Sequence, residues 1–146
     1  MYISLNWIKD FVNLDGVDIK QLLNKFTLST AEIEGVEYKG ENLTGVISVK
    51  IESVNPHPNS TKLHLLKINT GKGLVDVVCG APNVKTGLIV PFAQTGANVN
   101  GFEIKEAEIA GVKSCGMCCS EKELEISDDN SGLMVLPENT PLGVDI

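Results

Sequence analysis

The spacing of apolar residues changes near Ala31 in this 146-residue chain, and the change constrains the fold more than any other feature of the sequence. The stretch from Ile19 to Phe26 follows the i, i+3, i+4, i+7 pattern of an amphipathic helix. Beyond Ala31, apolar and polar residues alternate with the period of two that is typical of half-buried strands. We therefore predict a helical segment over 1–38 and a β domain with a C-terminal extension over 39–146.

Two short helices are expected in the first segment. Ser4 is a candidate N-cap for the first helix, and Asp18 is a candidate for the second, with Gln21 completing a near capping box. Trp7 and Phe11 share one helical face, and an aromatic pair on one face is usually part of a hydrophobic core. We therefore predict that both rings are buried.

The sequence from Ala31 onward predicts several short strands separated by glycine-rich turns, including a turn at Asn100–Gly101. Many short strands that follow helical material favour a small closed β barrel over a parallel α/β sheet. The fold class is thus mainly β with an α appendage. The expected strands are 31–38 with a bend at Gly35, 47–51, 63–68, 74–79, 88–93, 99–109 around the turn, and 132–137.

Composition excludes several classes of protein. With 42% hydrophobic and 21% charged residues the chain has an ordinary globular composition, which excludes intrinsic disorder. No apolar run approaches 18 residues, so no membrane span is predicted. The first nine residues lack the basic start and apolar run of a signal peptide, and we expect a cytoplasmic protein.

Charge is distributed unevenly along the chain. The total of −7 argues against nucleic acid as a partner, and all 12 basic residues are lysines, so the bidentate arginine fork that reads guanine is absent. However, residues 1–38 and 114–146 are acidic, whereas 39–113 hold 8 lysines and 6 acids. Residues 50–85 alone hold 5 lysines and 2 acids, so one face can still attract phosphate.

Two polar turns are candidate sites. His57 stands between two prolines, which present it on a rigid loop, although a stiff surface turn whose histidine caps a neighbour explains the same pattern. Cys79 precedes Gly80 at the end of an expected strand. No base is paired with Cys79 in the sequence, so a buried free cysteine is favoured over a nucleophile. We therefore expect no catalytic residue in this chain.

The remaining cysteines form a C-x-x-C motif, Cys115 and Cys118, with Cys119 adjacent. A zinc site would need a second cysteine or histidine pair at matching spacing, and a thioredoxin-like motif would need a βαβ unit before it; the sequence shows neither. The expected cytoplasmic location disfavours a disulfide. Reduced structural cysteines are favoured. The acidic run over 121–129 lacks calcium-loop spacing, and Gly71-x-Gly73 lacks a phosphate-loop fingerprint. No metal site is predicted.

These motifs, in their order and spacing, resemble the N-terminal part of bacterial phenylalanine–tRNA ligase β subunits. Ser60 and Thr61 depart from that pattern, as does Ala110, where a basic residue is common. The resemblance covers nearly the whole chain. It rests on Ser4, Trp7, Ile8, Leu28 and 32–34, then on His57-Pro58-Asn59 with Lys62-Leu63, Cys79 to Asn83, and Ser114 to Leu124.

The resemblance implies a five-stranded Greek-key OB-fold that binds tRNA, preceded by two helices of a discontinuous domain. It implies a non-catalytic tRNA-binding or structural module that supports aminoacylation of phenylalanine-specific tRNA by an intact α2β2 enzyme. The resemblance also implies the α subunit as a partner. It implies ATP and magnesium as cofactors of the intact enzyme, and no cofactor is expected in this segment. Neither DNA nor a membrane is an expected partner.

The candidate tRNA contacts combine lysines, which would face the phosphate backbone, with polar groups and backbone amides that the resemblance suggests. Two alternatives remain open: a structural module for subunit assembly with vestigial RNA affinity, and a free-standing tRNA-binding barrel, which the helical start disfavours. The candidates are His57, Asn59, Lys62, Lys67, Lys72, Asn83, Lys85, Lys113, Ser114, Gly116 and Met117.

Overall fold

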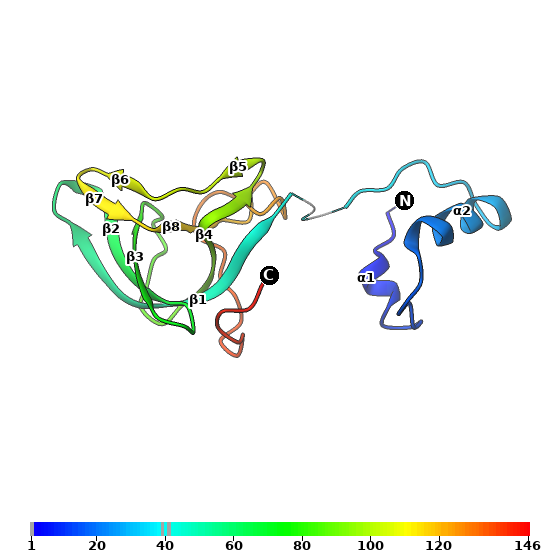
Figure 1. Ribbon diagram of the computed structural model, residues 1–146, viewed down its shortest axis with the longest axis horizontal. Coiled ribbons are helices and arrows are strands. Elements are labelled where there is room, and N and C mark those ends of the chain that lie inside the picture. The colour runs from blue at the N-terminus through cyan, green and yellow to red at the C-terminus, as the bar shows by residue number, and fades with distance from the viewer. Residues whose placement is uncertain (1, 39, 41) are drawn as a thin grey trace. The chain divides into compact units, whose positions relative to one another are not determined.

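The computed structural model describes residues 2–38, 40 and 42–146. It divides into two compact units, Met1–Tyr38 and Lys39–Ile146 (Figure 1). The regular elements are helices in the first unit and strands in the second. Whether the helical unit belongs to a discontinuous domain stays a prediction.

The helical unit contains α1 (Leu5–Ile8) and α2 (Ile19–Ser29). The Ser4 side chain accepts a hydrogen bond from the Trp7 amide at 3.3 Å, and Asp18 Oδ1 accepts one from the Gln21 amide at 3.2 Å. Each side chain satisfies a backbone donor that has no partner within the helix, so both predicted N-caps are confirmed. No described helix is long and apolar enough to cross a membrane.

Two predictions for this unit are wrong. Trp7 is 67% exposed and Phe11 is 77% exposed, and the two rings touch only edge to face with centroids 6.4 Å apart. Neither helix buries any residue, because two short helices alone offer too little surface to enclose a ring. Residues 31–38 form no strand, since no neighbouring segment supplies their backbone with ladder partners.

The described residues of the second unit form eight strands in two sheets. The larger sheet has the order β3-β2-β1-β4-β5, with β8 also on β4, and every pairing is antiparallel. A separate two-stranded sheet joins β6 and β7. The strands are β1 (Thr44–His57), β2 (Ser60–Asn69), β3 (Leu74–Cys79), β4 (Ile89–Val99), β5 (Phe102–Glu103), β6 (Ala107–Ile109), β7 (Val112–Ser114) and β8 (Gly116–Cys118).

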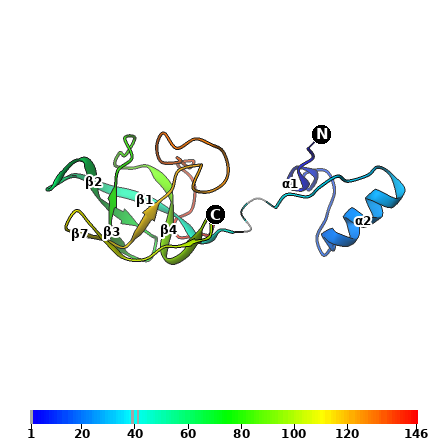
Figure 2. The same cartoon turned by 90° about the horizontal axis from the view of Figure 1, so that it is seen from above.

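The large sheet curls into a barrel, as Figures 1 and 2 show. The first half of β1 pairs with β4 and the second half with β2, with a register shift between Ile51 and Ser53 that bends the strand. The Cys115 amide donates to the Asp76 carbonyl at 3.2 Å, which joins the β7–β8 segment to β3. The predicted mainly β, OB-like fold is confirmed.

The barrel encloses an apolar core to which alternate residues of the long strands contribute. Val49, Ile51, Ile68 and Phe92 are each no more than 1% exposed. In β2 the exposed Lys67 lies between two buried residues, as the period-two signal over 63–68 predicts. Over 47–51 the same signal predicted the strand but not its burial, because Ser48 is buried as well. The strands predicted at 74–79 and 88–93 and the hairpin at Asn100–Gly101 are also present.

The C-terminal extension does not form the strand predicted over 132–137. Leu136 makes only an isolated bridge to Ile89. Further on, the extension runs beside β1, where the Ile146 amide donates to the Val46 carbonyl at 3.1 Å. The extension therefore covers backbone groups of β1 that would otherwise form an open sheet edge.

Candidate nucleic-acid interface

The turn between β1 and β2 holds His57 in a buried position. His57 is only 5% exposed, and its Nδ1 accepts a hydrogen bond from the Asn59 amide at 3.1 Å. Its Nε2 lies 3.2 Å from the Ile109 carbonyl oxygen. Because Nδ1 is an acceptor, the ring proton resides on Nε2 and is donated to Ile109. Both ring nitrogens therefore have partners within the protein.

Asn59 reaches the same hairpin from the same turn. Its Nδ2 donates to the Ala110 carbonyl at 2.9 Å. Ala110 and Gly111 form the tip of the β6–β7 hairpin with φ values of +51° and +86°. The structure thus brings the β1–β2 turn and the β6–β7 hairpin together at one end of the barrel.

Two of the predicted lysines lie at this end. Lys62 is exposed at the beginning of β2, and Lys113 is carried by β7. The Lys113 ammonium lies 2.7 Å from Glu106. Its hydrogen bond lowers the pKa of Glu106, and the carboxylate in turn raises the pKa of Lys113. Both side chains are largely solvated, so water screens this attraction.

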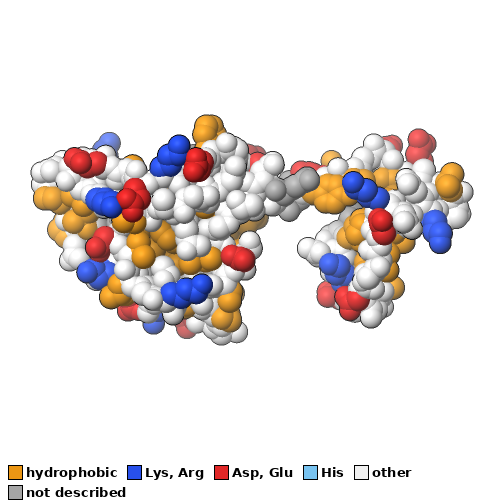
Figure 3. All heavy atoms as spheres, viewed as in Figure 1, with side chains coloured by type: hydrophobic (Ala, Val, Ile, Leu, Met, Phe, Trp, Pro, Cys, Tyr) orange, Lys and Arg blue, Asp and Glu red, His pale blue; other side chains and the backbone are white. Residues whose placement is uncertain are grey.

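Lys67 lies further along β2 and faces an acidic residue on the neighbouring strand. Its ammonium is 3.6 Å from Asp76, its register partner on β3. Figure 3 shows lysine and acidic side chains interspersed over the visible face of the β unit. Lys67 and Lys113 are therefore both balanced by local carboxylates.

Lys72 and Lys85 lie away from the end that carries Lys62. Lys72 is in the β2–β3 turn, and at a rise of about 3.3 Å per residue the strand from Lys62 to its end spans about 23 Å. Lys85 is in the β3–β4 loop, which returns to the sheet where the Gly87 amide donates to the Ile51 carbonyl. The five predicted lysines do not form a single cluster.

Asn83 and Ser114 have structural partners. Asn83 Nδ2 donates to the Leu133 carbonyl at 2.9 Å, and its Oδ1 accepts from the Leu133 amide at 2.8 Å. The Ser114 hydroxyl is buried, accepts from the Val78 amide at 3.1 Å and donates to the Gly116 carbonyl at 3.0 Å. Each of these side chains secures a backbone connection.

Gly116 and Met117 also serve packing. Gly116 has a φ of +131°, and a side-chain carbon there would lie 2.4 Å from the Phe92 ring. Met117 is half-buried and packs beside a cluster that includes Cys119 and Leu124. Their pattern in the sequence is accounted for by the close approach of β8 to β4.

The cysteines show no sign of activation. Burial raises the pKa of the Cys79 thiol, raises that of Cys118 further, and raises the pKa of Cys119 to about 12. A raised pKa keeps a thiol protonated at neutral pH, and a protonated thiol is a poor nucleophile. Among the described residues, no group of three or more His, Cys, Asp or Glu side chains could hold a metal ion.

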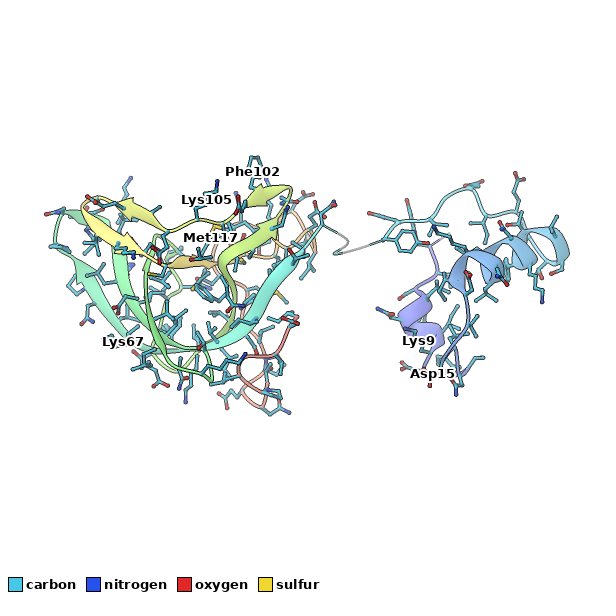
Figure 4. All side chains as sticks on the ribbon, in the orientation of Figure 1. Lys9, Asp15, Lys67, Phe102, Lys105 and Met117 are labelled. Carbon is cyan, nitrogen blue, oxygen red and sulfur yellow. The ribbon has the colours of Figure 1, made fainter. Side chains whose placement is uncertain are left out.

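Sequence reasoning missed three features of this surface. It did not pair Glu106 with Lys113 or Asp76 with Lys67, because cross-strand partners depend on register. Nor did it single out Phe102 as an exposed ring. Phe102 on β5 is 74% exposed and projects away from the barrel in Figure 4. The Asn100–Gly101 pair predicted the hairpin but not which of its faces is exposed.

A curled barrel whose β1–β2 turn meets the loop before its last strand defines an OB-type module of the kind that binds oligonucleotides at these loops. The chain belongs to the family described as a putative tRNA-binding domain, whose model matches residues 46–145. Its resemblance to the N-terminal region of phenylalanine–tRNA ligase beta subunits is also confirmed.

The relatives are similar along the whole of this chain. It is 40% identical over 147 residues to the beta subunit of Syntrophus aciditrophicus, and 43% identical over 145 residues to that of Geobacter sulfurreducens. These alignments cover 100% and 99% of this chain but 18% of each relative. The chain therefore spans less than a fifth of the length of the curated relatives it matches.

Solved structures show the same fold. A MetRS-related protein from Pyrococcus horikoshii superposes with a TM-score of 0.52 at 20% identity, covering 69% of this chain and 87% of that one. The C-terminal domain of Plasmodium vivax p43 superposes with a TM-score of 0.50 at 25% identity, covering 70% and 58%. Because the Pyrococcus protein is only 20% identical to this chain, it supports the barrel architecture and carries no argument about function.

Proposed function

We propose that the β unit binds the phosphate backbone of tRNA as part of a phenylalanine–tRNA ligase beta subunit. The observation that carries the proposal is the meeting of the β1–β2 turn and the β6–β7 hairpin, which places Lys62 and Lys113 at one end of the barrel. These are the two loops that OB-folds use for oligonucleotides. Membership of the putative tRNA-binding family supports the same ligand.

The chemistry available at this surface suits recognition of shape rather than sequence. Lysine presents a point charge, which neutralises phosphate without reading the edge of a base. Structured RNA is recognised largely through its backbone and shape, so a surface without arginine is adequate. Lys67, Lys72 and Lys85 would supply weaker, more distant contacts along the same RNA.

In this proposal, catalysis belongs to other parts of an α2β2 enzyme. The α subunit, ATP and magnesium would act outside this segment, in the cytoplasm, where the intact enzyme would aminoacylate phenylalanine-specific tRNA. The protonated thiols of Cys79, Cys118 and Cys119 are consistent with a segment that is inactive by itself.

The β unit would also interrupt a larger domain. β1 and the C-terminal extension are hydrogen-bonded neighbours through Val46 and Ile146, and a unit whose two end segments adjoin can be inserted into another domain. The helical unit leaves Trp7, Phe11 and Leu28 mostly exposed. Chain from elsewhere in the subunit would complete that domain by covering these side chains.

A structural role in subunit assembly is the second candidate. It is favoured by the finding that Asn83, Ser114, Gly116 and Met117 all serve internal packing or hydrogen bonding. The net charge of −7 also favours a structural role, because an acidic chain attracts phosphate poorly. This role predicts no tRNA binding at low salt but loss of subunit assembly when the β unit is deleted from the intact protein.

A titration of the chain with transcribed tRNA at low salt tests the proposal. The Lys62→Ala, Lys113→Ala double variant is expected to bind about tenfold more weakly, since each phosphate contact is salt-sensitive and contributes to affinity. A matched control, Lys20→Ala with Lys25→Ala on α2, removes the same charge from the helical unit. Equal binding by the parent and the first variant would show that this end of the barrel is not the site.

A further inference from the structure

We infer that His57 and Asn59 are positioning residues, which hold the β6–β7 hairpin and its Lys113 in place for RNA rather than touching RNA themselves. The inference rests on the proposed function and refines it. The resemblance alone suggests that both side chains contact the ligand. The contacts of the folded chain assign them a different task.

The hairpin has little stability of its own. β6 and β7 are three residues each and pair only with one another, outside the six-stranded sheet. All three residues of β6 are exposed, so the hairpin buries little apolar surface. An isolated two-stranded hairpin is marginal in water, and its position therefore depends on what holds its two ends.

The base of the hairpin is fixed to the barrel. The Ser114 hydroxyl accepts from the Val78 amide, and the next residue, Cys115, donates its amide to the Asp76 carbonyl. These bonds tie the end of β7 to β3. They leave the tip, four residues away at Ala110, to be held by something else.

The tip is held by the β1–β2 turn. His57 Nε2 donates to the Ile109 carbonyl at 3.2 Å, and Asn59 Nδ2 donates to the Ala110 carbonyl at 2.9 Å. Asn59 Nδ2 also lies 3.3 Å from the position that a side-chain carbon on Gly111 would take, so the contact is close. Two donors therefore fix two adjacent carbonyl groups of one tight turn.

These partners leave the His57 ring no nitrogen for phosphate, and they engage one Nδ2 hydrogen of the exposed Asn59 side chain with Ala110. Both nitrogens of the buried His57 ring are engaged, and a phosphate could reach them only by displacing Ile109 or the Asn59 amide. Lys113, by contrast, extends into solvent from the strand that follows the tip. Holding the hairpin reduces the ordering that RNA must impose on Lys113, and such pre-organisation raises affinity.

A double-mutant cycle separates positioning from contact. The variants are Asn59→Ala, Lys113→Ala and the two together, each titrated with transcribed tRNA at low salt. Amide hydrogen exchange over 107–114 is measured on the same proteins without RNA. Thr61→Ala is the matched control, because Thr61 is exposed at the start of β2, two residues from Asn59, and its side chain makes no bond to the hairpin.

Asn59→Ala is expected to speed exchange in the hairpin and to weaken tRNA binding about threefold to tenfold, the cost of ordering one long side chain. In the Lys113→Ala background the same substitution should change affinity by less than about 1.5-fold, because the lysine that it positions is already gone. Thr61→Ala should change neither quantity.

Three results would overturn the inference. Additive losses in the cycle would mean that Asn59 contacts RNA directly. Unchanged exchange would mean that Asn59 does not hold the hairpin, and faster exchange with unchanged affinity would exclude the hairpin from the site. Failure of the parent protein to bind tRNA contradicts the proposed function itself, and the exchange measurement, which needs no RNA, distinguishes that failure from the others.

Discussion

Asn83 binds both backbone groups of Leu133 through its side-chain amide, with hydrogen bonds of 2.9 and 2.8 Å. The two residues are 50 positions apart, so this pair connects the β3–β4 loop to the C-terminal extension. Gly132 lies against the same amide, where a side-chain carbon would come within 2.6 Å of Asn83. The contact secures the extension, and we therefore expect the amide to serve stability rather than RNA binding.

Replacing Asn83 with alanine should therefore affect stability rather than binding. The change leaves the Leu133 amide and carbonyl without partners, which costs about 2 kcal/mol in the free energy of unfolding. Urea unfolding should be followed by circular dichroism, because the only tryptophan and both tyrosines lie in the helical unit. A large loss of tRNA affinity in the folded variant, with stability unchanged, would restore Asn83 as a contact.

Removing the partner of Lys113 should strengthen binding. Glu106→Gln abolishes the 2.7 Å ion pair and leaves the ammonium available to phosphate, so tRNA affinity at low salt should rise about twofold to fivefold, within the range of a solvated ion pair. Glu138→Gln, an exposed change of equal charge in the C-terminal extension, serves as the control. Equal gains in both variants would mean that only net charge matters.

The buried cysteines should make the β unit less stable at alkaline pH. Burial raises the pKa of Cys119 to about 12, so the folded state holds its proton more tightly than the unfolded state does. Stability is therefore fully present below the unfolded pKa and falls as pH rises from about 9 towards 12. Near pH 10 the expected loss from this thiol is about 1.4 kcal/mol.

Urea unfolding at pH 7.5 and pH 10 measures this loss. Cys119→Ala should reduce the difference between the two pH values, whatever its effect on stability at neutral pH. A thiol reagent offers a second test at neutral pH. Half-buried Cys115 should react first, and Cys79, Cys118 and Cys119 only when the chain unfolds. Rapid labelling of all four thiols in the folded chain would contradict the burial described here.

The fluorescence of Trp7 should report a solvated ring. Trp7 is 67% exposed and meets only the edge of Phe11, so a soluble quencher should reach it in the folded chain almost as readily as in urea. In an intact beta subunit that completes the helical domain, the same ring should be shielded. Strong protection of Trp7 in the isolated chain would contradict the exposure of this face.

The barrel could be predicted because its evidence is local. Alternation over 47–51 and 63–68 reports the two faces of a strand, and the Asn100–Gly101 pair reports a hairpin turn. The burial of Trp7 could not be predicted in the same way. Helical periodicity identifies an apolar face, but it does not say whether the same stretch of chain supplies the surface that covers that face.

The same distinction between local signals and long-range contacts applies to the candidate site. The sequence identifies its motif residues but not their roles. A close approach or a buried hydrogen bond, as at Gly116 and Asn83, leaves the same pattern in a sequence as a binding site does. Lys67 and Lys113 were identified as cations. Their acidic partners, Asp76 and Glu106, depend on strand register and on side-chain reach across the hairpin, which the sequence does not specify.

The salt dependence of tRNA binding tests the central claim most directly. With ~3–5 phosphate contacts, log affinity should fall with log salt at a slope of about −0.7 per contact, and the Lys62→Ala, Lys113→Ala variant should lower the magnitude of that slope by about 1.4. The control lacking Lys20 and Lys25 should keep the parent slope. An affinity that does not depend on salt, or a slope that the barrel variant leaves unchanged, would contradict a backbone-binding site at this end of the barrel.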